Sequence, residues 1–362
     1  MRVTRGTSHN IVVSQRWLIY IVTILLSSFH DGMASKLVPP DSVAAQYSLT
    51  ATSSLPFPTA TQSAGDAQVF MSSQWSLYNG RVSWGGSDIA FVSDPFPNNP
   101  APVSATGTSL STDPVLQITY PAESYSGGTG GAQWYNQWNS TDGSSFNSML
   151  LSYELAFDSN FDWVKGGKLP GLRGGPDAFG CSGGNQPTGT DCFSTRLMWR
   201  SGAVGEVYAY MLMPNNLCSE DNIECNSDYG ISVDRGAFGF ATGQWMRITM
   251  LVQMNDPPDV ANGNVVLYFN DVMAFSQQNL QFRSGAGVNI GGIFFSTFFG
   301  GSDSSWATPQ TVHTYYRNFQ LYGSSAPSNL TGQKVGSTTR FTNSSWTPIL
   351  AGLINFIVYT FF

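Results

Sequence analysis

The sequence predicts an all-β fold, a jelly-roll sandwich of two antiparallel sheets, from its composition and its pattern of alternation. Of its 362 residues, 14% are aromatic and 38 are glycine, whereas only 11% are charged. A surface helix needs charged residues along its solvent-facing side, so this composition disfavours long helices. Aromatic strands joined by glycine-containing turns are favoured instead. Strand-like runs then recur between turn residues at intervals typical of a sandwich.

The individual strands are predicted from apolar residues at every second position. In residues 149–157 this alternation places Leu151, Tyr153 and Leu155 on one face. Further strands are predicted at residues 245–254, 265–269, 292–300 and 314–323. No internal repeat interrupts this order, and the length suits a single large core.

The two ends of the chain are predicted to be processing signals around one folded domain. The expected segments are a signal peptide at 1–34, a Ser/Thr/Pro-rich linker at 35–66, one domain at 67–323, a second linker at 324–337 and a GPI-attachment signal at 338–362.

The N-terminal prediction rests on three arginines before a short apolar run, residues 17–26, followed by Gly32 and Ala34. An uncleaved signal anchor is the alternative. The C-terminal prediction rests on an apolar tail, residues 349–362, that follows a polar stretch and has no basic residue after it. A transmembrane tail and a buried terminal strand are the alternatives. These features predict a secreted or cell-surface protein that meets the membrane only through a lipid anchor.

Glycosylation and disulfide signals agree with a secretory route. Asparagines in Asn-x-Ser/Thr sequons are Asn139, Asn329 and Asn343. The four cysteines are Cys181, Cys192, Cys218 and Cys225. Four cysteines allow three disulfide connectivities, and proximity in the sequence favours Cys181–Cys192 with Cys218–Cys225. Zinc binding is the weaker alternative, because the spacings differ from those of zinc sites and His313 is the only histidine outside the N-terminal region.

The distribution of charge points to an anionic partner despite a net charge of -7. The acidic balance disfavours nucleic acid and anionic membrane surfaces. However, five of the ten Lys and Arg residues between residues 37 and 324 lie between 165 and 200. They are Lys165, Lys168, Arg173, Arg196 and Arg200. Ordinary solvated side chains are the alternative explanation for this cluster.

A predicted β-hairpin places part of this cationic cluster on one face of two paired strands. Residues 194–200 and 206–212 are strand-like and are separated by five residues. Directly opposed residues of an antiparallel pair have a constant index sum, and a loop at residues 201–203 makes that sum 404. Arg196 then lies opposite Tyr208, and Ser194 lies opposite Tyr210, about 4.5–5.5 Å apart at Cβ. The other face, residues 197, 199, 207, 209 and 211, is apolar and is predicted to be core.

The polar face of this hairpin suits one reaction class. Its only carboxylate is Glu206, so the acid pair of glycoside hydrolysis is not evident. There is no GxSxG motif, and His313 is too isolated for a Ser-His-Asp triad. Arg with Tyr suits β-elimination on a uronic acid. The guanidinium neutralises the carboxylate beside the acidic proton, and a phenol or amine transfers protons. Free Tyr and Lys titrate near 10, so Arg196 would have to help.

These residues resemble polysaccharide lyase family 14, whose members include alginate lyases of marine molluscs and a glucuronic-acid polymer lyase of an algal virus. The resembling stretches are residues 120–135, the GGKLPGLRGG loop at 166–175, the Ser-x-Arg strand, the Tyr-x-Tyr strand and residues 294–309. The resemblance runs over roughly residues 115 to 322 and depends on the motifs in combination.

The resemblance implies a jelly-roll lyase that acts without a metal or other cofactor on an acidic polysaccharide, either alginate or glucuronan. It implies the catalytic residues Lys168, Ser194, Arg196, Tyr208 and Tyr210. Arg196 would neutralise the carboxylate, and Ser194 would orient it or a neighbouring hydroxyl. Tyr208 and Tyr210 would be base and acid, in an order that is left open, and Lys168 is a rival base. We assign Arg173 and Arg200 to substrate binding and expect a monomer. Two segments depart from the family pattern, the cysteine-bracketed residues 181–192 and the acidic residues 219–225.

Two other functions compete with the lyase. A catalytically silent, lectin-like surface protein could use the same fold, since fold does not determine function. A structural wall glycoprotein would account for the ends of the chain but not for Arg196 opposite Tyr208.

Overall fold

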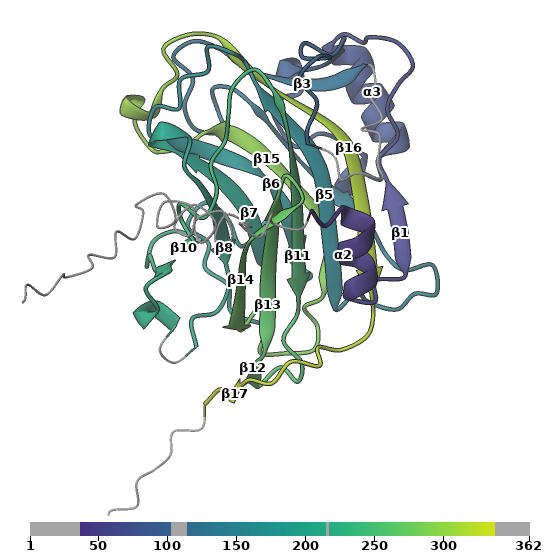
Figure 1. The fold of residues 1–362 in the computed structure, drawn as a ribbon, viewed down its shortest axis with the longest axis vertical. Helices are drawn as coiled ribbons and strands as arrows, with labels where there is room; N and C mark the ends of the chain where they lie inside the picture. The colour runs from purple at the N-terminus through teal and green to yellow at the C-terminus, as the bar shows by residue number, and fades with distance from the viewer. Residues whose placement is uncertain (1–36, 103–113, 215–216, 337–362) are drawn as a thin grey trace, which may run out of the picture.

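The computed structural model describes residues 37–102, 114–214 and 217–336, which form two packed antiparallel sheets (Figure 1). The predicted all-β sandwich is therefore confirmed. The predicted signal peptide, the predicted GPI-attachment signal and Asn343 lie outside the described residues.

Within the described residues, the larger sheet has eight strands, of which β5 and β16 lie near the centre. Its strands in spatial order are β14 (Val272–Leu280), β13 (Gly263–Phe269), β11 (Trp245–Gln253), β5 (Ser148–Phe157), β16 (Val312–Ser324), β3 (Val115–Tyr120) and β2 (Ile89–Val92), with β1 (Ala51–Ser54) also paired to β16.

The second sheet has seven strands in the described part of the chain and carries the predicted hairpin. Its spatial order is β4 (Ala132–Gln137), β15 (Ile290–Phe299), β6 (Gly166–Gly174), β7 (Phe193–Arg200), β8 (Gly205–Tyr210), β10 (Ile231–Val233) and β9 (Ile223–Glu224). A small separate pair joins β12 (Val260–Ala261) to β17 (Gln333–Lys334).

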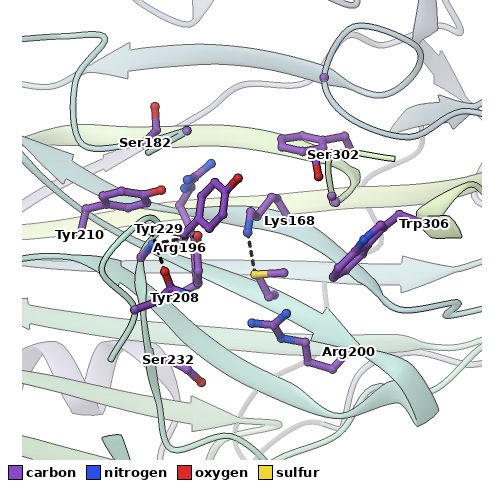
Figure 2. A pocket seen from close by; sticks show the side chains of 18 of the residues that line it. Lys168, Ser182, Arg196, Arg200, Tyr208, Tyr210, Tyr229, Ser232, Ser302 and Trp306 are labelled. Carbon is purple, nitrogen blue, oxygen red and sulfur yellow. Dashed lines mark hydrogen bonds between the residues drawn. The ribbon is translucent and has the colours of Figure 1, made fainter. Parts of the chain in front are cut away.

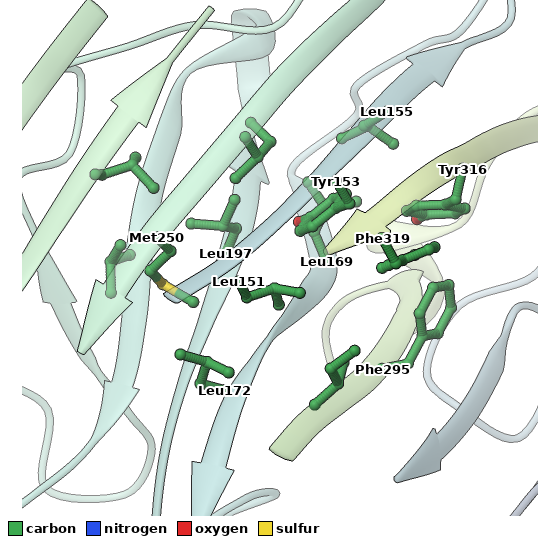
Figure 3. Close-up of a cluster of buried hydrophobic side chains, with 14 of the residues drawn as sticks. Leu151, Tyr153, Leu155, Leu169, Leu172, Leu197, Met250, Phe295, Tyr316 and Phe319 are labelled. Atoms are coloured by element: carbon green, nitrogen blue, oxygen red, sulfur yellow. The ribbon is translucent and has the colours of Figure 1, made fainter. Parts of the chain in front are cut away.

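The main core lies between the facing sides of the two sheets, where alternate residues of every long strand interlock (Figure 3). Leu151, Tyr153 and Leu155 of β5 point into it as predicted, and they meet Leu169 and Leu197 from the other sheet. The predicted core face of the hairpin is confirmed as well, since residues 197, 199, 207, 209 and 211 are all buried in this cluster. The polar face of the hairpin must therefore point outward from the sandwich.

The described α-helices are short. They are α2 (Pro40–Gln46) and α3 (Ala64–Gln74). Ala67 and Met71 of α3 join the main core, and Trp75 just beyond it donates its indole N–H to the Pro56 carbonyl oxygen at 2.6 Å. Five single-turn 3₁₀ segments occupy connections in the described chain: Tyr78–Gly80, Gly86–Asp88, Ser201–Ala203, Leu217–Ser219 and Ser304–Trp306.

The prediction of a linker at residues 35–66 is wrong for the residues that the structure describes. Helix α2 packs Val43 and Ala44 onto the outer face of the larger sheet, against Leu150 and Leu251, and β1 adds a strand beside β16 (Figure 1). A few apolar side chains among many Ser, Thr and Pro residues are enough to hold the segment, because the sheet offers them an apolar outer surface. The average composition of the segment does not reveal these few apolar positions.

The second predicted linker, residues 324–337, also contains ordered structure in its described part. Its strand β17 pairs with β12, and Leu330 accepts a hydrogen bond from the Asn262 side chain at 2.9 Å. Asn139 and Asn329 are exposed outside helices and strands, so both predicted sequons are accessible. Among the described helices, none combines the length and apolar character needed to span a bilayer.

Candidate active site

A cavity of about 630 Å³ crosses the outer face of the seven-stranded sheet. It is lined by residues from β4, β15, β6, β7, β8, β9 and β10, together with residues of the connecting loops. Figure 2 shows the tyrosines clustered with Arg196 at one end of this cavity, and Trp306 at the other end. Its volume falls in the range of small-molecule and saccharide-sized pockets.

The hairpin that builds the cavity floor has the predicted register. Arg196 on β7 is directly opposite Tyr208 on β8, and Ser194 is opposite Tyr210. The connecting turn is Ser201–Ala203, with Gly202 in a left-handed conformation at φ 70°. This turn allows the chain to reverse within three residues and keeps the index sum even. The guanidinium and both phenols therefore share the outer face of the sheet.

Arg196 is a buried cation with no ion pair to any of the described residues. Its side chain lies over the Phe294 ring, with Cζ 4.3 Å from the ring centroid, and only 2% of the residue is exposed. Its Nε has no hydrogen-bond partner among the described residues. Burial lowers the pKa of Arg196, although the nearby tyrosines oppose this shift. Because a buried charge is costly unless it is paired, this guanidinium is arranged to receive an anion from the cavity.

Lys168 on β6 lies beside the same tyrosines. Its Nζ is 3.5 Å from the centroid of the Tyr208 ring and 2.7 Å from the Met198 sulfur, neither of which neutralises its charge. Burial, together with the positive charges of Arg196 and Arg200, holds the pKa of Lys168 well below its usual value. The neutral amine, which can accept a proton, is thereby favoured.

The two phenols each accept a hydrogen bond from a backbone N–H. Gly230 donates to the Tyr208 oxygen at 2.9 Å, and Gly184 donates to the Tyr210 oxygen at 3.0 Å. Burial and the neighbouring Tyr210 raise the pKa of Tyr208, and the Gly230 N–H and Arg196 only partly offset this. The phenol of Tyr208 therefore keeps its proton at neutral pH and can donate it.

Three predicted site residues do not offer free polar groups to the cavity. Ser194 is 1% exposed and donates its hydroxyl to the Cys181 carbonyl oxygen at 2.6 Å, so it holds a loop rather than lining the cavity. Arg173 also lies outside the lining and donates to the carbonyl oxygens of Gly175 and Asp177. The assignments of these two residues to substrate contact are therefore not supported by the geometry.

Arg200 lines the cavity, but its charge is already paired. Its guanidinium contacts the Glu206 carboxylate at 2.6 Å, and Arg235 contacts the other oxygen of Glu206 at 2.5 Å. Burial acts to raise the pKa of Glu206, yet the hydrogen bond and charge of Arg200, with Ser232 and Arg235, lower it. The single carboxylate on the hairpin face thus neutralises cations at the cavity edge and does not form half of an acid pair.

Sequence reasoning missed the aromatic residues of the lining. Trp84, Phe298 and Trp306 come from two distant parts of the chain, and Figure 2 shows Trp306 at the end of the cavity away from the tyrosines. Trp84 packs edge-on against Phe298, with ring centroids 5.8 Å apart. Tyr229, which also lines the cavity, is 49% exposed. Residues 298 and 306 lie within the 294–309 stretch that resembles the lyase family, which was the available signal.

The favoured cysteine pairing is confirmed, with disulfides Cys181–Cys192 and Cys218–Cys225. Among the described residues, one group of possible metal-binding side chains stands close together, Cys181, Asp191 and Cys192. Its two sulfurs are joined to each other, so it has no thiolate to offer a metal. His313 lies on the other sheet, where it contacts Asp158 at 2.9 Å.

The fold and the site define a β-sandwich protein whose outer sheet face carries an aromatic-lined cleft with an unpaired, anion-receiving arginine. The chain belongs to polysaccharide lyase family 14, whose family model matches residues 108–319.

Solved structures and one curated protein are similar to this chain. The PL-14 alginate lyase of the mollusc Aplysia kurodai is 30% identical, with a TM-score of 0.60, over 74% of this chain and 100% of the lyase. The alginate lyase Aly36B, 19% identical with a TM-score of 0.53 over 79% of this chain and 100% of its own, shares the fold. Exolysin of Paramecium bursaria Chlorella virus 1 is 28% identical over an alignment of 245 residues, and the match covers 61% of this chain and 35% of exolysin.

Proposed function

We propose that this protein is a polysaccharide lyase that cleaves a uronic-acid polymer, of alginate or glucuronan type, by β-elimination. The observation that carries the proposal is Arg196, a buried guanidinium with an unpartnered Nε in the cleft, directly opposite Tyr208. Membership of polysaccharide lyase family 14 and similarity to an Aplysia alginate lyase support it.

Arg196 receives the carboxylate of the sugar that is to be cleaved. Removing the proton next to a carboxylate places negative charge on its oxygens, and a fixed guanidinium stabilises that charge. Because Arg196 has no competing acid within the described chain, its whole charge is available to the substrate. Arg200 and Arg235, which share Glu206, contribute a weaker field at the cleft edge.

Lys168 is the base in this proposal. Burial and two neighbouring guanidinium groups favour its neutral amine, which takes the proton from the carbon beside the carboxylate. The bond between the next ring carbon and the glycosidic oxygen then breaks, and a carbon–carbon double bond forms between the two ring carbons. The sugar bearing the new double bond becomes the end of one product.

Tyr208 is the acid. Its raised pKa keeps the phenol protonated, and the phenol gives its proton to the departing glycosidic oxygen. Protons balance when the Lys168 ammonium later returns its proton to the Tyr208 phenolate, whose ring it touches at 3.5 Å. Tyr210 packs edge-on against Tyr208 and supports its orientation. The rings of Trp84, Trp306 and Tyr229 offer apolar faces on which neighbouring sugars can stack.

The direct test is ultraviolet absorbance of the unsaturated product after incubation with alginate, glucuronan and mixed-uronate polymers between pH 6 and 10. The Arg196→Met variant is the control for activity from contaminants. Absorbance growth on at least one polymer with wild-type protein supports the lyase. Binding to these polymers without any such signal would instead identify a lectin-like protein. The aromatic rings that line the cleft could bind sugars in such a protein as well.

We further propose that the protein is exported as a monomer and held at the cell surface by a GPI anchor. Two disulfides and the exposed sequons at Asn139 and Asn329 support passage through an oxidising secretory compartment. Release of the protein from cells by a phosphatidylinositol-specific phospholipase would support the anchor. Retention after that treatment would contradict it.

A further inference from the structure

Two disulfide-containing loops lie together at the tyrosine end of the cleft. The first, residues 181–192, is closed by Cys181–Cys192, and the second, residues 218–230, contains the Cys218–Cys225 bridge. Ser182 and Gly183 from the first loop and Tyr229 and Gly230 from the second line the cavity. We call the two loops together the strap.

Each loop of the strap donates one peptide N–H to one phenol of the site. Gly184 of the first loop donates to Tyr210, and Gly230 of the second donates to Tyr208, at 3.0 and 2.9 Å. A fixed N–H that points at a phenol oxygen stabilises the phenolate that forms when the proton leaves. The strap therefore acts on the chemistry of the site without itself exchanging protons.

Both donors are glycines for a geometric reason. Gly184 has φ +95°, a conformation that other residues adopt only with strain. At Gly230 an added Cβ would lie 2.8 Å from the Tyr208 ring carbon that bears the hydroxyl, so a side chain would push the N–H away from the oxygen. The backbone conformation at Gly184 and the close approach to Tyr208 at Gly230 thus favour glycine at these two positions.

One side chain ties the two loops to each other. Gln186 of the first loop donates its amide N–H groups to the carbonyl oxygens of Tyr229 and Ser227 in the second, at 2.9 and 3.4 Å. The receiving turn is rigid, because the Asn226 side chain accepts N–H groups from both Asp228 and Tyr229. Gln186 is half-buried and lies two residues from Gly184, while its acceptor Tyr229 directly precedes Gly230.

We propose that Gln186 is a positioning residue that joins the two disulfide-containing loops into one strap and thereby holds the Gly184 and Gly230 N–H groups on Tyr210 and Tyr208. The part of this inference that concerns turnover depends on the proposed lyase function. The strap includes residues 181–192 and 219–225, the two segments expected from the sequence to depart from the family pattern.

The test compares three substitutions in the full protein. Gln186→Glu keeps the side-chain size but cannot donate to the two carbonyl groups. Gln186→Lys restores donors at a similar reach. Asn185→Ala alters the adjacent exposed residue, whose side chain has no hydrogen bond within the described chain, and is the matched control. If Gln186→Glu lowers the melting temperature of the whole domain, Gln186→Met, which also lacks a donor, takes its place.

Hydrogen–deuterium exchange gives a readout that needs no activity. With Gln186→Glu, we expect peptides containing Gly184 and peptides containing Gly230 to exchange at least about tenfold faster, which corresponds to loss of a hydrogen bond of typical strength. Gln186→Lys and Asn185→Ala should match the wild type. Unchanged exchange at Gly230 in the Gln186→Glu protein would overturn the tie between the loops.

Steady-state kinetics then tests positioning. We expect Gln186→Glu to lower kcat about tenfold with KM within about twofold, because the N–H groups act on the phenols in the transition state. Gln186→Lys should recover most of kcat. Faster exchange with an unchanged kcat, or a rise in KM alone, would overturn the positioning role. A wild-type protein without lyase activity would instead overturn the proposed function, and the exchange experiment would still decide whether Gln186 joins the loops.

Discussion

Arg196 and Tyr208 face each other across the β7–β8 hairpin, with the guanidinium carbon 5.9 Å from the centroid of the phenol ring. The pairing follows from strand alternation and a three-residue turn, and it puts an unpaired cation and a proton donor into one cleft.

Arg196 should contribute to activity at the expense of stability. We expect Arg196→Met to lower kcat/KM roughly 1,000-fold, the scale of losing a dedicated oxyanion contact. The free energy of unfolding should stay the same or rise by about 1 kcal/mol, because an unpaired buried charge is removed.

Arg317→Met is the matched control for this experiment, since Arg317 is equally buried but contacts Glu154 at 2.7 Å and Asp94 at 2.5 Å. Its loss should lower the free energy of unfolding by about 3–5 kcal/mol. Urea denaturation of both variants measures the difference, and a large destabilisation by Arg196→Met would contradict the assignment of an unpaired charge.

Lys168 should make stability depend on pH in a defined direction. Its pKa is lowered in the folded protein, so the unfolded chain binds more protons between that lowered value and about 10.4. Stability linked to Lys168 therefore rises with pH across this window and is constant below it. Relative to Lys168→Met, the wild type should gain stability as pH increases toward 10. Denaturation of both proteins at several alkaline pH values checks this, and a pH-independent difference would count against it.

The tyrosines should affect turnover rather than binding. Tyr208→Phe removes the proposed proton donor, so kcat should fall about 100- to 10,000-fold with little change in KM. Tyr315→Phe, on the other sheet, removes a phenol hydrogen-bonded to Asp158 and should leave kcat unchanged. Full activity of Tyr208→Phe would refute its role as acid.

Trp306 should contribute to substrate binding at the far end of the cleft. Trp306→Ala removes an aromatic face that lines the cavity, so KM for long polymers should rise roughly tenfold while kcat is kept. Phe179→Ala is a suitable control, because Phe179 is 52% exposed but lies outside the cavity lining. Kinetics on a size series of oligosaccharides would show whether the effect disappears with short substrates, as this placement requires.

Much of the fold and the floor of the site could be predicted from the sequence alone. Strand alternation has a period of two, so it is a local property, and it gave the core faces of β5, β7 and β8 before any tertiary information. The opposition of Arg196 to Tyr208 needed only a loop length and the parity of the strands. Proximity along the chain likewise favoured the cysteine pairing that is observed.

The state of each charged group was decided by the tertiary structure. Sequence placed Arg173, Arg196 and Arg200 in one cluster, but only packing determined that Glu206 neutralises Arg200, that carbonyl groups hold Arg173, and that Arg196 is left for a ligand. Composition predicted a linker where Val43 in fact packs on the sheet. The convergence of Trp84 and Trp306, and of Gly184 and Gly230 on the phenols, joins segments far apart in the chain. Such contacts depend on how the sheet brings distant loops together, and no local rule of sequence contains that information.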